Sequence, residues 1–454
     1  MERILEKQRE FFKTGKTLDV NFRIASLKKM KDSILNNLEE LVEAFKTDYN
    51  KCEFDVYSTE VGLVIKEINY FIKHAKKLSK AKRVRTSIIN MPSKGYIYNE
   101  PYGNALIVAP WNYPFQLTMM PLVGAIAAGN TVFLKSSRNT KEVTKIIEKI
   151  LSVFNDEYVY VMENTKENMD KLFNLKFDYI FYTGSTSVAK ELMEKQAKYL
   201  TPLTLELGGK SPCIVDKSAN IEKSARKIVW GKYLNAGQTC VAPDYILVHN
   251  DIKREFMKYV IKYIQEFYYT ENQLNETFTH VINEKSLNKL ISLINRDKLV
   301  FGGNVINNTL EPTVLEDVSL DDEIMKEEIF GPIMPVVEFN DLGDVINHLK
   351  DLDKPLALYY FGKDYKKVLE NISFGGGCVN DTIMHLTEEK LPFGGVGLSG
   401  MGSYHGKKSF EVFSHQKSIL RKHSSLELSL KYPPYNKSKL KLTKMYFGVK
   451  NKNK

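Results

Sequence analysis

The sequence predicts an α/β protein built on a parallel, helix-covered sheet, followed by a second α/β domain. Between residues 104 and 209, five short apolar runs alternate with helical stretches and short connections. Such alternation is typical of parallel strands that helices bury on both faces. The alternation starts again after Gly209, and a chain of 454 residues is too long for one hydrophobic core.

The first hundred residues are helical in pattern and then change to β-type runs. Apolar side chains recur at steps of three and four, which lines one helix face, at Leu27, Met30, Ile34, Leu38, Leu41 and Phe45. A second such stretch runs from Tyr57 to about Ile72, and we expect both to be packing elements. Residues 82–103 carry β-type runs broken by Pro92, Gly95 and Pro101, which predicts a hairpin-like excursion.

The regular alternation begins at residue 104. Strands are expected at 104–110, 131–136, 158–163, 178–184 and 202–209, with helices at 114–129, 139–154, near 166–173 and at 186–199. A second α/β domain is expected to begin near Gly208, with strands at 211–216, 245–249, 333–339, 355–361 and 376–381. Its helices are expected to end near Tyr233 and to begin at Asp251, and the segments at 327–332 and 391–410 have the pattern of loops.

Polar residues follow the predicted strands directly. Asn112 comes after the first strand and Lys135 ends the second. Gly184 and Ser185 lead from the fourth strand into a helix, and Glu206 ends the fifth. Ligands of parallel sheets bind beyond the carboxyl ends of the strands, and a helix N-terminus can hold a phosphate. The segment GSTSVA is not the GxGxxG fingerprint, so by itself it does not indicate a nucleotide site.

Cys240 lies in the small-residue loop NAGQTCVAPD, and two interpretations of it are open. A free cysteine usually acts as a buried apolar side chain, whereas a displayed thiol can act as a nucleophile. The other cysteines, Cys52, Cys213 and Cys378, lie far apart, and structural roles are favoured for them. Because no CxxC pair occurs, neither a disulfide framework nor a metal site is expected.

The composition is that of a globular protein, with 43% apolar and 26% charged residues. The formal net charge is +10, but residues 431–454 contain eight lysines and no acid. We therefore expect a solvated, partly disordered basic tail, with no nucleic-acid partner and at most peripheral membrane contact. The first residues lack an apolar signal region and no apolar run of about 18 residues occurs, so a cytoplasmic protein is expected.

Six segments, taken in order, resemble the aldehyde dehydrogenases, and specifically the class 3 and fatty aldehyde dehydrogenase branch. They are IVAPWNYPF, FYTGSTSVAK, LTLELGGKSPC, NAGQTCVAPDYIL, EEIFGP and LPFGGVGLSGMGSYHGKKSF, and the resemblance covers about residues 5–435. It implies a Rossmann-like NAD(P)-binding domain of residues 1–81 and 101–207 and a catalytic domain of residues 208–409. Residues 82–100 and 410–430 would form a bridging or oligomerisation element that makes a homodimer, with a basic tail at 431–454.

The resemblance implies oxidation of an aldehyde to a carboxylic acid with NAD or NADP. Cys240 would be the nucleophile that forms a thiohemiacetal and then a thioester. Asn112 and the backbone N–H of Cys240 would stabilise the oxyanion. Glu206 would be the general base that activates water for hydrolysis of the thioester.

The resemblance also implies cofactor residues, namely Lys135 and Glu328 on the two riboses, Phe330 beside the nicotinamide ribose, Gly184 and Ser185 at the phosphates, and Leu207. Arg138 stands where the branch usually has a glutamate that binds a ribose 2′-hydroxyl. Two interpretations of Arg138 are about equally supported: it binds the 2′-phosphate of NADP, or it points into solvent.

A medium-chain, long-chain or aromatic aldehyde is the implied substrate. Tyr113, Phe115 and His405 would lie near it, with core packing as the alternative for Phe115 and a structural role for His405. A CoA-acylating semialdehyde dehydrogenase is a competing function, against which Glu206 argues. A structural protein that has lost catalysis is another, against which the joint presence of Cys240 and Glu206 argues.

Overall fold

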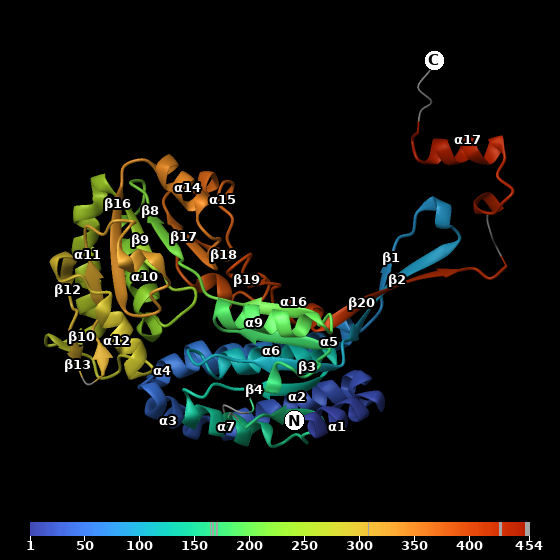
Figure 1. Cartoon of the computed structure of the whole chain (residues 1–454), viewed down its shortest axis with the longest axis horizontal. Coiled ribbons are helices and arrows are strands. Elements are labelled where there is room, and N and C mark those ends of the chain that lie inside the picture. The colour runs from blue at the N-terminus through green and yellow to red at the C-terminus, as the bar shows by residue number, and fades with distance from the viewer. Residues whose placement is uncertain (164, 166–167, 169–170, 307, 426–428, 450–454) are drawn as a thin grey trace, which may run out of the picture. The chain divides into compact units, whose positions relative to one another are not determined.

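The computed structural model describes the chain except for residues 164, 166–167, 169–170, 307, 426–428 and 450–454. It divides into two compact units, one formed by Met1–Ser79 with Glu100–His415, the other by Lys80–Asn99 with Gln416–Lys454. The larger unit contains two helix-covered, mostly parallel sheets (Figure 1), so the predicted α/β fold class is confirmed. The helix expected near 166–173 falls partly outside the described residues.

The first sheet has six strands in the order β19-β7-β6-β3-β4-β5. All five predicted strands are present and run parallel, as β3 (Asn104–Val108), β4 (Thr131–Lys135), β5 (Val159–Val161), β6 (Tyr179–Thr183) and β7 (Leu203–Glu206). The sixth strand, β19 (Gly400–Met401), pairs antiparallel with β7. It belongs to the glycine-rich segment that we expected to be a loop of the second domain. Two residues are too few to show a strand periodicity.

Helices cover this sheet on the pattern that the sequence predicts. They include α6 (Gln116–Ala128), α7 (Lys141–Leu151) and α9 (Thr186–Ala197), and the N-terminal helices are α1 (Glu2–Lys13), α2 (Val20–Asn36), α3 (Leu38–Tyr49) and α5 (Gly62–Leu78). Every residue of α6 is buried, and the helix ends at Gly129, whose φ of 102° suits glycine.

The structure divides the first of the two predicted N-terminal stretches and confirms the second. The apolar stripe from Leu27 to Phe45 is divided between α2 and α3, because the Asn37 side chain donates to the Ser33 carbonyl at 2.7 Å. Asparagine side chains compete in this way with the helical backbone bonds. The second stretch, Tyr57 to about Ile72, is helical as expected, as a π-helical turn, η2 (Val56–Val61), followed by α5, and α4 (Glu53–Asp55) precedes it.

The second sheet has seven strands in the order β12-β15-β16-β9-β8-β17-β18. The predicted strands are β8 (Pro212–Val215), β9 (Tyr245–His249), β16 (Ile333–Phe339), β17 (Ala357–Phe361) and β18 (Gly376–Val379). The sequence analysis missed the edge formed by β12 (Leu299–Phe301) and β15 (Thr313–Leu315). Two predicted helices, α10 (Ile221–Tyr233) and α11 (Asn250–Tyr268), pack against one another.

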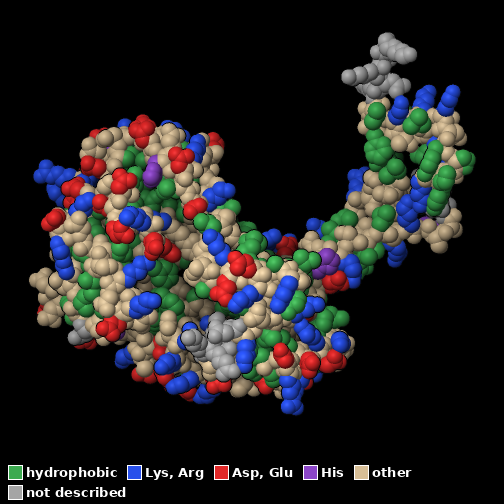
Figure 2. All heavy atoms as spheres, in the orientation of Figure 1, with side chains coloured by type: hydrophobic (Ala, Val, Ile, Leu, Met, Phe, Trp, Pro, Cys, Tyr) green, Lys and Arg blue, Asp and Glu red, His purple; other side chains and the backbone are tan. Residues whose placement is uncertain are grey.

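The smaller unit contains a three-stranded sheet in the order β1-β2-β20. β1 (Lys82–Val84) and β2 (Ser93–Pro101) pair antiparallel, which confirms the predicted hairpin, and β20 (Ser414–Lys422) completes the sheet. The tail is not wholly irregular, because Lys437–Tyr446 form the helix α17. Lysines and exposed apolar side chains lie together on this unit (Figure 2). Within the described residues, we find no helix that is both long and apolar enough to cross a membrane.

Candidate active site

Two cavities of the larger unit meet at Cys240. The first, of about 550 Å³, opens at the carboxyl ends of β6 and β7 and is also lined by loops of the second sheet. The second, of about 370 Å³, is mainly apolar and extends toward η2 and α10. Four residues line both cavities, namely Leu117, Cys240, Phe393 and Tyr404. The thiol therefore lies where the two cavities join.

The structure brings most of the predicted site residues to these cavities. The first cavity is lined by Asn112, Gly184, Ser185, Glu206, Leu207, Cys240, Glu328 and Phe330, and the second by Tyr113, Cys240 and His405. Phe115 lines neither cavity and is wholly buried in the hydrophobic core, which favours the packing alternative. Lys135 and Arg138 also lie outside the lining of both cavities.

A strained turn presents the Cys240 loop. Asn235, Ala236 and Gly237 have consecutive φ values of 55°, 52° and 70°, in the left-handed region. A Cβ atom at Gly237 would collide with the carbonyl oxygen of Gly331, so the turn requires glycine there. Strain of this kind is concentrated at functional sites.

Hydrogen bonds of the Gln238 side chain hold the same loop in place. Its amide nitrogen donates to the carbonyl oxygens of Asn235 at 3.1 Å and His280 at 3.0 Å. Its side-chain oxygen accepts from the Ile282 backbone N–H at 2.9 Å. Three hydrogen bonds from one buried side chain hold the loop two residues before the thiol.

The surroundings of Cys240 disfavour its thiolate on balance. Burial raises the pKa of the thiol above the ordinary range, and the carboxylates of Glu328 and Glu206 act in the same direction, whereas the backbone N–H groups of Cys240 and Val241 lower the pKa. A positive charge brought into the site would favour the thiolate.

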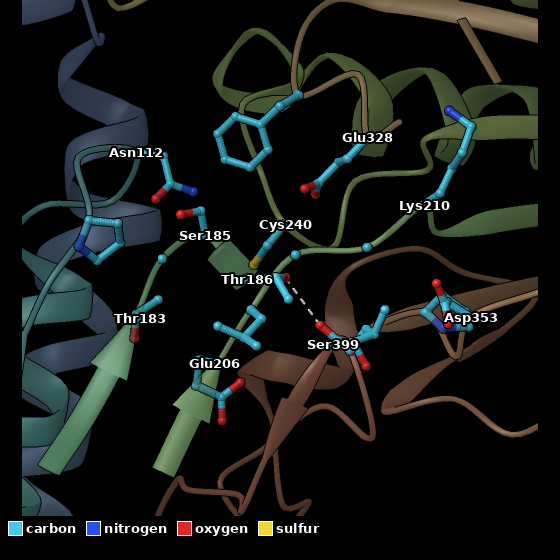
Figure 3. A pocket seen from close by; sticks show the side chains of 18 of the residues that line it. Asn112, Thr183, Ser185, Thr186, Glu206, Lys210, Cys240, Glu328, Asp353 and Ser399 are labelled. Carbon is cyan, nitrogen blue, oxygen red and sulfur yellow. Dashed lines mark hydrogen bonds between the residues drawn. The ribbon is translucent and has the colours of Figure 1, made fainter. Parts of the chain in front are cut away.

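Hydrogen bonds hold both the backbone carbonyl and the side-chain amide of Asn112, and one N–H of that amide has no partner among the described residues. Its backbone carbonyl accepts from the Tyr49 hydroxyl at 3.1 Å and from the Asn235 side chain at 3.0 Å. Its own amide nitrogen donates to the Gln238 carbonyl at 3.0 Å. A primary amide carries two N–H bonds, so the second remains for a ligand. Figure 3 shows Asn112 and Cys240 bordering the same space.

Glu206 is a buried carboxylate without a hydrogen-bond partner. It lies at the end of β7, is only 3% exposed, and neither of its oxygens has a partner in the described structure. Burial therefore raises its pKa well above the usual value for a glutamate. In Figure 3 the carboxylate points away from Cys240. An unpaired buried acid costs folding free energy, which marks Glu206 as a functional group.

The first cavity has features that suit a dinucleotide. Ser185 precedes α9, and no side chain caps that helix, so its first backbone N–H groups are available to a phosphate. The Glu328 carboxylate lies against Gly208, where a Cβ atom would collide with it. Burial and the nearby Asp244 raise the pKa of Glu328 to about 8. The Phe330 ring lies 5.5 Å from the Trp111 ring, nearly perpendicular to it.

Lys135 and Arg138 form a separate pair of cations at the end of β4. Lys135 lies beside Val108 in the parallel register of β3 and β4. Burial and, to a smaller extent, the charge of Arg138 lower the pKa of Lys135 to about 8. Arg138 itself is exposed.

An ion pair near Glu328 was not predicted from the sequence. Lys210 binds Asp244 at 2.7 Å and also donates to the carbonyl oxygens of Ile324 and Glu327. The other carboxylate oxygen of Asp244 accepts from the Ile329 N–H at 3.1 Å. Both charged residues lie inside segments that carry the family resemblance, but no spacing pattern shows that they pair across 34 positions.

A parallel sheet whose carboxyl edge borders a cavity with a thiol and a buried carboxylate fits an oxidoreductase that works with a nicotinamide nucleotide. Residues 1–419 match the model of the aldehyde dehydrogenase family. The chain belongs to this family.

Similar proteins agree along the whole chain. A 4,4′-diaponeurosporen-aldehyde dehydrogenase of Staphylococcus aureus is 44% identical, over 96% of this chain and 97% of that protein. Aldehyde dehydrogenase family 3 member A2 of Mus musculus is 40% identical, over 100% of this chain and 95% of that protein. A mouse aldehyde dehydrogenase named dimeric and NADP-preferring is 40% identical, over 95% of this chain and 97% of that protein.

Solved structures give the same result. The substrate-bound state of Staphylococcus aureus AldH has a TM-score of 0.95 and 43% identity, covering 98% of this chain and 99% of that one. A betaine aldehyde dehydrogenase from Staphylococcus aureus in complex with NAD⁺ has a TM-score of 0.82 and 25% identity, covering 95% and 91%. The protein is therefore an enzyme that oxidises aldehydes to carboxylic acids with NAD or NADP as cofactor.

Proposed function

We propose that this enzyme works through a covalent acyl group on Cys240, with Asn112 stabilising the oxyanion and Glu206 activating the hydrolytic water. One observation carries the proposal: an unpaired buried carboxylate lies beside a cavity that meets a second, apolar cavity at a thiol. The experiment is to incubate purified protein with hexanal, decanal or benzaldehyde and either cofactor. We expect NAD(P)H and the corresponding carboxylic acid to form. If neither product forms, the proposal is overturned.

In the first step the Cys240 thiol releases its proton to solvent water, the sulfur bonds to the aldehyde carbon, and the carbonyl oxygen becomes an oxyanion. The free N–H of the Asn112 side chain donates to that oxygen, together with the backbone N–H of Cys240. A bound oxidised nicotinamide supplies a hydride acceptor and a positive charge. Loss of hydride from the tetrahedral carbon leaves a thioester on Cys240, because carbon is oxidised while the C–S bond stays intact.

Glu206 then takes a proton from the water that attacks the thioester, and the acid leaves as the C–S bond breaks. Because its carboxylate points away from Cys240 in Figure 3, the side chain must rotate toward the thioester to do so. Its raised pKa makes the ionised carboxylate a stronger proton acceptor than an ordinary glutamate. The base must be ionised, so the hydrolysis rate is expected to increase with pH.

The residues of the first cavity fit NAD or NADP. Its volume of about 550 Å³ lies within the usual range of ligand pockets, about 300–1,000 Å³. The α9 N-terminus near Ser185 would hold the pyrophosphate, and Glu328 would accept hydrogen bonds from the ribose of the nicotinamide. Leu207 and Phe330 would pack against the cofactor from the cavity wall.

The second cavity supports a medium-chain, long-chain or aromatic aldehyde as substrate. Its walls include Leu63, Trp230 and Ile383, and it ends at the thiol, so an apolar chain would be removed from water there. Tyr113 and His405 contribute polar edges. The Tyr113 hydroxyl is occupied by a 2.7 Å hydrogen bond to Thr239 Oγ1.

Replacement of the oxyanion donor tests the role of Asn112. Asn112→Ala is expected to reduce kcat by about 10²–10³-fold, the usual loss when one oxyanion donor is removed. Steady-state kinetics at saturating cofactor measure this loss, and thermal unfolding shows whether the variant is folded. A kcat within a few-fold of wild type in a folded variant would show that Asn112 does not stabilise the oxyanion.

Cofactor preference depends on Arg138. If its guanidinium binds the 2′-phosphate of NADP, Arg138→Glu is expected to reduce kcat/KM for NADP by about 10-fold or more, since charge-assisted bonds contribute about 1.5–3 kcal/mol. The value for NAD should change much less. Wild-type enzyme that strongly prefers NAD would instead support the solvent-exposed interpretation of Arg138.

We also propose a cytoplasmic homodimer. All four cysteines are free, which fits a reducing compartment. The exposed strand β20 of the smaller unit leaves backbone groups that a second copy can pair with. Light scattering of the purified protein would test the dimer, and a monomer at micromolar concentration would contradict it.

A further inference from the structure

A wholly buried ion pair lies behind the loop that carries Asn112. Lys51 Nζ binds Glu60 Oε1 at 2.7 Å, and both side chains are 0% exposed. Burying two charges usually costs more than their attraction returns, so such a pair is poor evidence for stability. The groups that the Lys51–Glu60 pair contacts therefore indicate its role.

The second oxygen of Glu60 contacts the start of α6. Glu60 Oε2 accepts the backbone N–H of Gln116, the first residue of the helix, at 2.8 Å. No side chain of the flanking residues caps α6, and the helix is buried along its entire length, so water does not reach this N–H. A carboxylate at this position satisfies the backbone and interacts favourably with the helix dipole.

Lys51, the other member of the pair, contacts the loop that carries Asn112 at Tyr113. Lys51 Nζ lies 4.2 Å from the centroid of the Tyr113 ring, in cation–π geometry. The hydroxyl of Tyr113 in turn bonds Thr239, directly before Cys240. The pair thus contacts the Asn112–Gln116 loop at Tyr113 and at Gln116.

We propose that Glu60, held in place by Lys51, is a positioning residue for the oxyanion donor. It fixes the α6 end of the loop, while the hydrogen bonds of Tyr49 and Asn235 to the Asn112 carbonyl fix the other end. The side-chain amide of Asn112 then needs no reorganisation when the oxyanion forms. This inference rests on the proposed role of Asn112 but assigns residues that do not touch substrate.

The test compares two double variants, both of which remove the charges at positions 51 and 60. K51M/E60Q keeps an acceptor for the Gln116 N–H, whereas K51M/E60M has nearly the same shape and lacks that acceptor. We expect K51M/E60M to have a kcat about 100-fold lower than K51M/E60Q, since small misplacements of catalytic groups cost about that much. The KM for cofactor should be the same in both.

The outcomes distinguish a positioning role of the Lys51–Glu60 pair from a purely structural role. Equal kcat values per folded enzyme in the two variants, with only the melting temperature differing, would overturn the proposal. K298M, which removes the Lys298–Asp322 ion pair elsewhere in the larger unit, is the control and should keep the wild-type kcat. If wild-type protein formed no NAD(P)H, the proposed function would fail, whereas an active wild type with equal double variants refutes only the positioning role.

Discussion

Cys240→Ser is expected to lose dehydrogenase turnover by at least about 10⁴-fold, because a hydroxyl is a much weaker nucleophile than a thiolate and no other described thiol lines either cavity. NAD(P)H formation from decanal measures the loss. The substitution removes only the sulfur, so the cofactor should still bind, which quenching of protein fluorescence can show.

Cys378→Ser is the matched control for this experiment. Cys378 is a partly buried thiol in β18, 3.6 Å from His385 Nδ1, and it lines neither cavity. Its replacement should leave turnover within a few-fold of wild type. Substantial activity in Cys240→Ser, or a comparable loss in Cys378→Ser, would contradict the assignment of Cys240 as nucleophile.

Glu206→Gln is expected to separate acylation from hydrolysis. Without the base, steady-state turnover should fall by about 10²–10⁴-fold, while the first turnover still releases about one NAD(P)H per site. Rapid mixing with saturating aldehyde would show this burst followed by a slow phase. Because the Glu206 oxygens have no partner among the described residues, the change removes no hydrogen bond, and because it also removes a buried ionisable group, the variant should be at least as stable as wild type.

The pH dependence supplies the second part of this test. The raised pKa of Glu206 means that the wild-type hydrolysis rate should increase as pH rises through that pKa. The remaining slow phase of Glu206→Gln should not show this increase. A variant that shows no burst and has the wild-type pH profile would mean that Glu206 is not the base.

Much of the fold was predictable because its strands are buried on both faces. Runs such as 104–108 and 131–135 are apolar at nearly every position, and the glycine at 129 marks a helix end. The division between α2 and α3 was not predictable, because it depends on one side-chain bond from Asn37 and leaves the apolar spacing intact. The short strand β19 gives no periodic signal either.

The site was predictable from strand ends and family resemblance together. Asn112 and Glu206 satisfy both conditions, whereas Cys240 lies in a loop and satisfies the resemblance alone, and the structure places all three around one cavity. Phe115 satisfies the resemblance alone, and its side chain packs in the core. The Lys51–Glu60 pair satisfies neither condition. No local sequence pattern shows that a lysine and a glutamate nine positions apart form a buried ion pair.

The central claim is an acyl group on Cys240 that Glu206 removes, and mass spectrometry of acid-quenched Glu206→Gln tests it most directly. After mixing with decanal and oxidised cofactor, we expect a protein heavier by one decanoyl group, located on the peptide that contains Cys240. The adduct should be absent when cofactor is omitted. An unmodified protein that has nevertheless produced NAD(P)H, or an adduct on another residue, would contradict the account.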